Sequence, residues 1–389
     1  MHGRRVWAWI PLPAPPPGRR SPCRSVSADH WPPSLHLVGS KALGGAERWV
    51  HRFALALAEE GAPAVVGVRA GGDLAGIDLG LPVRALPFRT VWDPLSRRAV
   101  SRLIAELEPA IVQTYMGRAT RTTRLPPRER RAAGPVHLAR LGGYYALGPY
   151  RHADAWIGNT RGLCDWMVRQ GLPADRVHHI YNFADPARPR PAADVEALRL
   201  RLGIPADASV LLCLGRLVPV KGHAGLLQAA ALLPQRIDDR PWRLVLVGDG
   251  PLRAGLERQA ADLGLSDRLI WAGWQQDPGR WLQLADLVVF PSRDAETLGN
   301  VILEAWAWQR PLVTTAFRGA REIAHHGADA WCVPCDDPTG LAAGIRTLLA
   351  DAGLRHALVQ RGAARVATEF GKDAILAQYR ALYHHLMRA

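Results

Sequence analysis

Residues 286–307 read DLVVFPSRDAETLGNVILEAWA and predict a buried strand, a turn and a helix. The apolar run 287–290 is typical of a strand that is covered on both faces, as in a parallel sheet. Pro291 ends this strand, and the apolar residues that follow recur at helical spacing. Two carboxylates therefore bracket the expected helix start, Glu296 in the turn and Glu304 within the helix.

The residues between these carboxylates carry backbone N–H groups that have no partner inside the helix and that form the positive end of its dipole. They are Thr297, Leu298, Gly299 and Asn300. A diphosphate docks well on such groups, and sugar or ribose hydroxyls are neutral donors that a flanking carboxylate can accept. We interpret the pattern as a nucleotide-sugar site. An isolated pair of glutamates at this spacing is more often a helix cap and a solvated side chain.

Two cations follow another expected strand, residues 209–214. This strand runs directly into GRLVPVKG, in which Gly215 is followed by Arg216 and then Lys221. Ligands bind at the carboxyl ends of strands in an open parallel sheet, and an arginine fork with a lysine point charge suits a pyrophosphate. A solvated loop with two ordinary charges is the alternative for this segment alone.

A glycine turn, VGDGP, follows the expected strand 243–247 and contains Gly248, Asp249 and Gly250. It imitates a dinucleotide fingerprint, but an arginine stands where the third glycine belongs. We interpret it as a turn that lets a base or ribose approach the backbone, and a purely structural turn is an equal alternative. Pro251 is suited to the first position of the following helix.

These motifs, together with WAGW at residues 271–274, occur in a fixed order and resemble the donor domain of retaining glycosyltransferase family 4. The resemblance covers nearly all of residues 205–370 and extends to the amino-terminal half through GGAE at residues 44–47. It implies an α/β protein of the GT-B fold, in which two Rossmann-like domains with doubly wound parallel sheets face a central cleft.

The resemblance also implies metal-independent transfer of a hexose from a nucleotide diphosphate sugar, with a UDP-sugar as the favoured donor, and retention at the anomeric carbon. Arg216, Lys221 and Glu296 are then catalytic, because the cations stabilise the leaving diphosphate and Glu296 orients the sugar. No metal or other cofactor is expected. The implied donor-binding residues are Gly44, Gly45, Gly215, Gly248, Asp249, Gly250, Trp274, Thr297, Leu298, Gly299, Asn300 and Glu304, the last of which binds the ribose.

The acceptor side departs from the family pattern. Many members carry histidines after the strand near residue 112 and a His-Gly turn near residue 141, whereas this chain has Gln113 and Leu141-Gly142-Gly143 at these places. The candidates for lining the acceptor cleft are Gln113, Arg118, Gly142 and Tyr144.

The formal net charge of +14 belongs almost entirely to the amino-terminal half. Residues 1–190 hold 27 Lys and Arg against 14 Asp and Glu, whereas residues 191–389 hold 22 against 21. Such a basic surface suits nucleic acid, an anionic membrane or a phosphorylated glycolipid, and a solvated helix face is the plain alternative. Beside a donor site, we expect an anionic glycolipid acceptor, by resemblance the lipopolysaccharide core, and no nucleic acid. The densest cluster is Arg118, Arg121, Arg124, Arg128, Arg130 and Arg131.

Strands and expected helices alternate in both halves, which predicts two doubly wound domains. We expect a Pro-rich disordered extension over residues 1–34, an acceptor-side domain over 35–190, a donor domain over 191–370, and a helix over 371–389 that crosses back to the first domain. Strands are expected near 35–39, 64–69, 110–115, 136–140, 155–158, 209–214, 243–247, 268–271, 286–290 and 311–315.

No segment of the sequence approaches the apolar length that spans a bilayer. The expected location is therefore the cytoplasm, at the inner face of the membrane, with peripheral electrostatic contact. Other classes remain open: a nicotinamide oxidoreductase, a phosphorylase or UDP-GlcNAc epimerase-like enzyme of the same fold, or a non-catalytic nucleotide-sugar-binding protein. WCVPC at residues 331–335 imitates a redox motif, but the acidic residues after it raise a thiol pKa.

Overall fold

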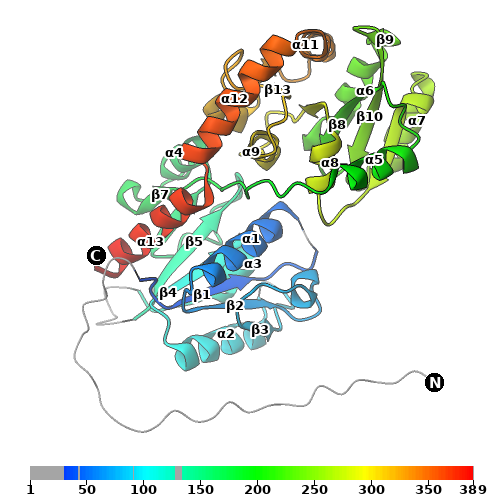
Figure 1. The fold of residues 1–389 in the computed structure, drawn as a ribbon. Coiled ribbons are helices and arrows are strands. Elements are labelled where there is room, and N and C mark those ends of the chain that lie inside the picture. The colour runs from blue at the N-terminus through cyan, green and yellow to red at the C-terminus, as the bar shows by residue number, and fades with distance from the viewer. Residues whose placement is uncertain (1–29, 43, 91, 128–133, 389) are drawn as a thin grey trace, which may run out of the picture.

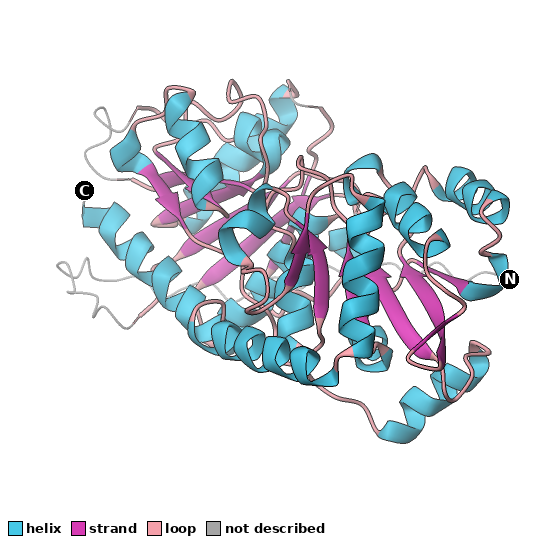
Figure 2. Ribbon diagram, turned by 90° about the horizontal axis from the view of Figure 1, so that it is seen from above, coloured by secondary structure: helices cyan, strands magenta, loops and turns pink. Residues whose placement is uncertain are grey.

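The protein consists of two α/β domains, each built on one sheet, with helices on both faces of each sheet (Figures 1 and 2). Its structure is a computed structural model that describes residues 30–42, 44–90, 92–127 and 134–388. Most of the expected amino-terminal extension therefore lies outside the described residues, as do Arg128, Arg130 and Arg131.

The first domain contains a parallel sheet of strand order β3-β2-β1-β4-β5-β6-β7. From β1 the chain builds β2 and β3 on one side of the sheet and then β4 to β7 on the other. The connections that follow β1 and β4 therefore run in opposite directions, which makes the carboxyl ends of these two strands a switch point. The strands are β1 (Ser34–Val38), β2 (Ala64–Arg69), β3 (Val83–Leu86), β4 (Ile111–Tyr115), β5 (Val136–Leu141), β6 (Ala155–Gly158) and β7 (Val177–His179). The helices are α1 (Gly45–Glu59), α2 (Pro94–Leu107), α3 (Met116–Thr122) and α4 (Arg161–Arg169).

The second domain repeats this plan with strand order β11-β10-β8-β12-β13-β14, and the short β9 pairs antiparallel with β10. Its switch point lies between β8 and β12, which are buried along their whole length. The strands are β8 (Ser209–Leu214), β9 (Arg236–Ile237), β10 (Arg240–Val247), β11 (Leu269–Gly273), β12 (Leu287–Phe290), β13 (Leu312–Thr315) and β14 (Trp331–Val333). The helices are α5 (Ala192–Arg201), α6 (His223–Ala231), α7 (Arg253–Asp262), α8 (Gly279–Leu284), α9 (Asn300–Ala307), α10 (Arg318–Ile323), α11 (Pro338–Ala350) and α12 (Ala352–Thr368).

All ten expected strands form, so the prediction of doubly wound parallel sheets is confirmed. The sequence did not predict β3, β7, β9 and β14, which have two to four residues each and lie at or near sheet edges. The expected position of Pro251 is wrong: α7 begins at Arg253, and Pro251 lies in the turn before it.

Helix α13 (Lys372–Arg388) packs against the first domain, although the chain reaches it from the second (Figure 1). Its buried Tyr379 and Tyr383 share one core with Trp49 and Phe53 of α1. The two chain segments that connect the domains lie side by side, because the Ala184 N–H donates to the Phe370 carbonyl at 3.0 Å. The last helix therefore completes the core of the first domain.

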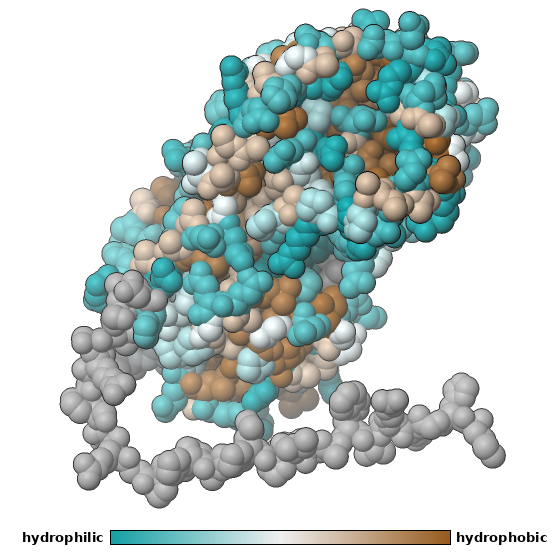
Figure 3. All heavy atoms as spheres, viewed as in Figure 1, coloured by the Kyte–Doolittle hydropathy of each residue, from teal (hydrophilic) through white to brown (hydrophobic). Residues whose placement is uncertain are grey.

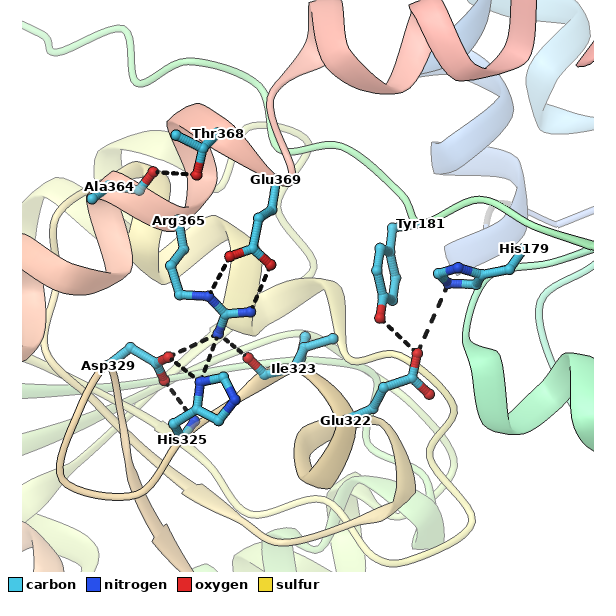
Figure 4. A network of polar contacts seen from close by, with 10 residues as sticks. All are labelled: His179, Tyr181, Glu322, Ile323, His325, Asp329, Ala364, Arg365, Thr368 and Glu369. Carbon is cyan, nitrogen blue, oxygen red and sulfur yellow. Dashed lines mark hydrogen bonds and ion pairs between the residues drawn. The ribbon is translucent and has the colours of Figure 1, made fainter. Parts of the chain in front are cut away.

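Polar contacts also join the domains near these connections (Figure 4). Glu322 of α10 accepts hydrogen bonds from the backbone N–H groups of Arg161, at 2.7 Å, and Gly162, at 3.0 Å. It thus caps α4 of the other domain, where the Thr160 hydroxyl also accepts from a backbone N–H, that of Leu163. The Tyr181 hydroxyl donates to the same carboxylate at 2.7 Å.

Hydrophilic and apolar side chains are interspersed over the face shown in Figure 3. No helix among the described residues is long and apolar enough to cross a membrane. One exposed aromatic side chain lies beside a basic cluster: Trp92 is 68% exposed, and the Arg121 guanidinium lies 5.4 Å from the centre of its ring. Burial lowers the pKa of Arg124, and the nearby Arg97 and Arg121 lower it further.

Candidate active site

A cavity of about 760 Å³ lies between the two domains. Residues 44–182 supply one side, called here the N-terminal wall, and residues 214–318 supply the other, the C-terminal wall. Both sheets present the carboxyl ends of their strands to it, which is where such folds bind ligands. The sequence-predicted residues that line it are Gly44, Gly45, Gly142, Tyr144, Gly215, Arg216, Lys221, Gly248, Asp249, Trp274, Glu296, Thr297, Leu298, Gly299, Asn300 and Glu304.

On the C-terminal wall, Lys221 forms an ion pair with Glu296 at 2.6 Å. The local sequence permits this pair, because Gly222 has φ 68° and a Cβ there would overlap the carbonyl oxygen of Pro291. The loop after β8 is thereby held against the loop after β12, which carries Glu296. Arg216 is exposed and forms no ion pair with the described part of the chain.

The glycine turns of this wall serve close packing of backbone on backbone. A Cβ at Gly248, which has φ 146°, would overlap the carbonyl oxygen of Gly215, and a Cβ at Gly250 would lie 2.6 Å from that of Leu217. Gly250 is not among the residues that line the cavity, unlike Gly248 and Asp249. Gly250 is therefore explained by close backbone packing in the turn. The predicted contact between Gly250 and a donor lacks support.

The start of α9 faces the cavity as the sequence predicts. Gly299 has φ 76°, and a Cβ there would lie 2.6 Å from the ring of Phe317. The backbone N–H groups of Leu298, Gly299 and Asn300 make no hydrogen bond to the described part of the chain. These donors remain available to an anion in the cavity.

Glu304 has a partner that the sequence did not reveal. Arg52 of α1 crosses from the N-terminal wall and binds Glu304 at 2.5 Å and Asp185 at 2.8 Å. Burial opposes the charge of Arg52, but the two carboxylates together raise its pKa. The residue expected to bind ribose is thus also a contact between the domains.

Arg140 is the main element of the N-terminal wall that sequence reasoning missed. It is only 4% exposed, lies over the Trp49 ring at 4.6 Å, and donates from Nε to the Tyr379 hydroxyl at 2.9 Å. It also donates to Asn182 Oδ1, and Asn182 Nδ2 donates to Asn300 Oδ1 at 2.6 Å, which links β5 to the start of α9. The available signal was an arginine within residues 136–140, an expected strand of a parallel sheet that helices cover.

Two of the four predicted acceptor residues do not line the cavity. The prediction for Gln113 is wrong, because this side chain is fully buried and bonds the hydroxyls of Tyr115, at 2.6 Å, and Tyr383, at 2.8 Å. Helix α13 covers this part of β4, so Gln113 belongs to the core. Arg118 donates to the Phe88 carbonyl at 3.1 Å, outside the cavity lining.

The charge of the cavity is positive overall. The lining contains the cations Arg48, Arg52, Arg140, Arg216, Lys221 and Arg318 and the carboxylates Asp249, Asp294, Glu296 and Glu304. Six cations against four carboxylates leave a formal excess of two positive charges, which suits a dianionic ligand such as a diphosphate.

Metal and thiol chemistry find no support in the described residues. They include no group of three or more His, Cys, Asp or Glu side chains placed to hold a metal ion. Burial and then Asp329 raise the pKa of Cys332 to about 12, and burial and then Asp294 raise that of Cys335. A reactive thiolate needs a lowered pKa, so the rejection of a redox role at residues 331–335 is supported.

Two family models match adjacent parts of the chain: Glycosyltransferase Family 4 over residues 43–188 and Glycosyl transferases group 1 over residues 194–365. The lipopolysaccharide core biosynthesis glycosyltransferase LpsE of Rhizobium meliloti (strain 1021) is 33% identical over 343 residues, covering 86% of this chain and 94% of the relative. LpsD of the same organism is 33% identical over 346 residues, covering 87% and 95%.

Solved structures agree on the fold. Anabaena Alr3699/HepE, solved in complex with UDP and glucose, aligns with a TM-score of 0.79 and 22% identity over 91% of this chain and 99% of that one. WaaG, a glycosyltransferase involved in lipopolysaccharide biosynthesis, aligns with a TM-score of 0.65 and 20% identity over 90% and 98%. Both family models match, two transferases are one-third identical over most of their length, and the architecture is shared. We conclude that the chain belongs to glycosyltransferase family 4 and is a glycosyltransferase of the GT-B fold.

Proposed function

We propose that this transferase moves a hexose from a nucleotide diphosphate sugar, with a UDP-sugar as the favoured donor, to an anionic, membrane-associated glycolipid of the lipopolysaccharide core type. The observation that carries the proposal is the start of α9, where three backbone N–H groups without partners in the described chain face a cavity that Arg216 and Lys221 also line. The UDP-glucose complex of HepE supports the donor class. The names of LpsE and LpsD support the acceptor class.

The proposed reaction retains the configuration at the anomeric carbon. The bond from this carbon to the diphosphate oxygen breaks, a bond to the acceptor oxygen forms on the same face, and the acceptor proton passes to the leaving phosphate. Arg216, Lys221 and the N–H groups of α9 stabilise the negative charge that grows on the diphosphate. These groups supply the charge stabilisation without a metal.

The two glutamates orient the donor in this scheme. Glu296 accepts hydrogen bonds from the hydroxyl groups of the sugar, and Glu304 accepts hydrogen bonds from those of the ribose. Their ion pairs with Lys221 and Arg52 are compatible with these roles, because each carboxylate has about four lone-pair sites and one cation leaves several of them available. The cations also remove the repulsion between these carboxylates and a diphosphate.

The basic surface near Trp92 supports peripheral contact with an anionic membrane. An exposed tryptophan beside Arg121, which is itself near Arg124, combines an aromatic anchor with positive charge, a pairing that favours the polar interface of a bilayer. We propose that this surface brings the cavity to a membrane-bound acceptor from the cytoplasmic side.

Release of nucleotide diphosphate tests the proposal. The purified protein is given UDP-, GDP- and ADP-sugars, with and without lipopolysaccharide from Rhizobium meliloti strains that lack LpsE or LpsD, beside a Glu296→Ala variant. Release that requires one donor and the acceptor, and that the variant loses, is expected. Conversion of UDP-GlcNAc without an acceptor indicates an epimerase instead, and tight donor binding without release indicates a non-catalytic protein.

A further inference from the structure

Two buried polar side chains of the N-terminal wall lack the partners that burial normally requires. Arg140 is 4% exposed and Asn159 is 5% exposed. Within the described part of the chain, Arg140 forms no ion pair with a carboxylate, and the Asn159 side chain makes no hydrogen bond from Nδ2 or to its buried Oδ1. A buried charge without a counter-charge costs free energy, and the Nδ2 of Asn159 is a donor that remains open to a ligand.

Both side chains border the same small space inside the cavity. Gly142 lies between them, and a Cβ at this position would be 3.9 Å from Asn159 Nδ2 and 4.0 Å from Arg140 Nη1. Arg140, Gly142 and Asn159 all line the cavity. The absence of a side chain at residue 142 therefore leaves room beside two N–H donors.

The guanidinium is fixed in this orientation by its other contacts. Its Nε donates to Tyr379 and its Nη2 to Asn182, while its face rests on the Trp49 ring. Nη1 is the remaining nitrogen and lies toward Gly142. A donor whose position is set before binding loses little entropy when it engages a ligand.

We propose that Arg140 and Asn159 form a subsite for an anionic oxygen group of the acceptor, a phosphate or a carboxylate, with Gly142 providing the space for it. This inference rests on the proposed function and specifies the acceptor chemistry. A group with two or three oxygens accepts hydrogen bonds from both donors at once, and its charge compensates the buried guanidinium. The donor diphosphate has separate cations on the C-terminal wall, Arg216 and Lys221.

Gly142→Ala is the sharpest probe of this subsite. Its backbone lies outside the left-handed region and the new methyl group meets no atom closer than 3.9 Å, so the variant should fold normally while the methyl group fills the space. The matched control is Gly148→Ala in the same loop, where a Cβ meets nothing within 4 Å. Asn159→Asp is the second probe, because its carboxylate supplies an internal anion beside Arg140.

The expected result is a rise of about tenfold or more in the acceptor KM of both probe variants, since a hydrogen bond to a charged group is lost or blocked. Their affinity for UDP, measured by calorimetry, should stay within about twofold of the wild-type value, and Gly148→Ala should match the wild type in both. Arg140→Gln should show the same KM effect if thermal unfolding shows that it remains folded.

Chemical treatment of the acceptor identifies the anionic group. Wild-type KM is compared for the same core oligosaccharide before and after removal of phosphate with hydrogen fluoride, and before and after reduction of its carboxyl groups. One treatment should raise the wild-type KM and leave that of Gly142→Ala unchanged. The subsite is refuted if neither treatment matters, or if the probe variants lose UDP affinity, which would assign the donors to the diphosphate. Failure of the wild type to transfer to any acceptor would remove the proposed function and this assignment together.

Discussion

The two walls of the cavity carry opposite balances of charge. The C-terminal wall contributes three cations and four carboxylates, whereas the N-terminal wall contributes three arginines and no carboxylate. The positive excess of the cavity therefore originates in the acceptor-side domain. One wall is neutralised internally, chiefly by the Lys221–Glu296 pair, and the other depends on Glu304 across the cavity and on what binds there. On the C-terminal wall Lys221 and Arg318 are paired with carboxylates of the same wall and Arg216 is not, whereas the N-terminal wall has no carboxylate of its own to pair with.

The largest effect should come from the unpaired cation of the C-terminal wall. Arg216→Ala should lose about 2.7–4 kcal/mol of transition-state stabilisation, a fall in kcat of about a hundredfold or more, because the leaving diphosphate loses an electrostatic contact. Single-turnover rates at saturating donor measure this loss. Arg346→Gln, a change at an exposed arginine of α11, is the matched control. Wild-type turnover in Arg216→Ala would remove this residue from the mechanism.

The next largest effect should come from breaking the ion pair between the two walls. A double-mutant cycle with Arg52→Gln and Glu304→Gln should give a coupling free energy of about 1.5–3 kcal/mol in urea unfolding, since the pair is largely buried and charged. Additive single-variant effects would mean that the two domains do not depend on this ion pair.

Acid should weaken both domains, because each contains a buried histidine. Burial lowers the pKa of His36 in β1 to about 3 and that of His223 in α6 to about 4, whereas unfolded histidine titrates near 6.5. The unfolded chain then binds more protons below pH 6.5, so the stabilising contribution is complete above that pH and decreases as pH falls, by up to about 1.4 kcal/mol per pH unit for each residue. Urea midpoints between pH 7.5 and 5 measure the slope, which should be shallower in His36→Gln. An unchanged slope would exclude His36 as the cause.

The bond between α13 and the N-terminal wall is a smaller contribution. Tyr379→Phe removes the hydroxyl that accepts from Arg140 Nε and should cost about 1 kcal/mol of stability. Because Arg140 loses one of the contacts that fix it, acceptor KM should also rise while UDP affinity is retained. Chemical unfolding and steady-state kinetics on the same preparation test both parts, and a loss of UDP affinity alone would contradict the separation of the walls.

The smallest expected effect is that of EDTA. Protein cations and backbone N–H groups stabilise the diphosphate in the proposed mechanism, so chelation of divalent metals should change the rate by less than about twofold. Activity that disappears with EDTA and returns with Mg²⁺ would show that these groups are insufficient.

The sequence predicted the C-terminal wall better than the N-terminal wall, and the reason is the range of the contacts. Glu296, Glu304 and the N–H groups between them belong to one strand, turn and helix, so their arrangement follows from neighbouring residues. Arg140, in contrast, is fixed by Tyr379, which lies 239 residues away along the chain. A local sequence pattern cannot predict a contact between residues so far apart in the chain.

Gln113 is a second residue whose environment depends on a contact distant in sequence, and here the prediction was wrong. A polar residue near the carboxyl end of a central strand is a reasonable candidate for a cleft, and only the return of α13 puts the Tyr383 hydroxyl against it. The family resemblance supplied the two-domain architecture but no acceptor residue, because this chain departs from the family motif at residue 141. The short edge strands escaped prediction since two to four residues carry no measurable periodicity.

Helix α13 also sets the order in which the protein can mature. Domains generally fold as they leave the ribosome, the amino-terminal one first. Here the first domain to be synthesised lacks Ile375, Leu376, Tyr379 and Tyr383 until translation is almost finished, because these core residues belong to the last helix. A nascent chain that stops before residue 372 would carry a complete second sheet and an open first core. Premature termination near the end of the gene should therefore damage the domain that was made earliest.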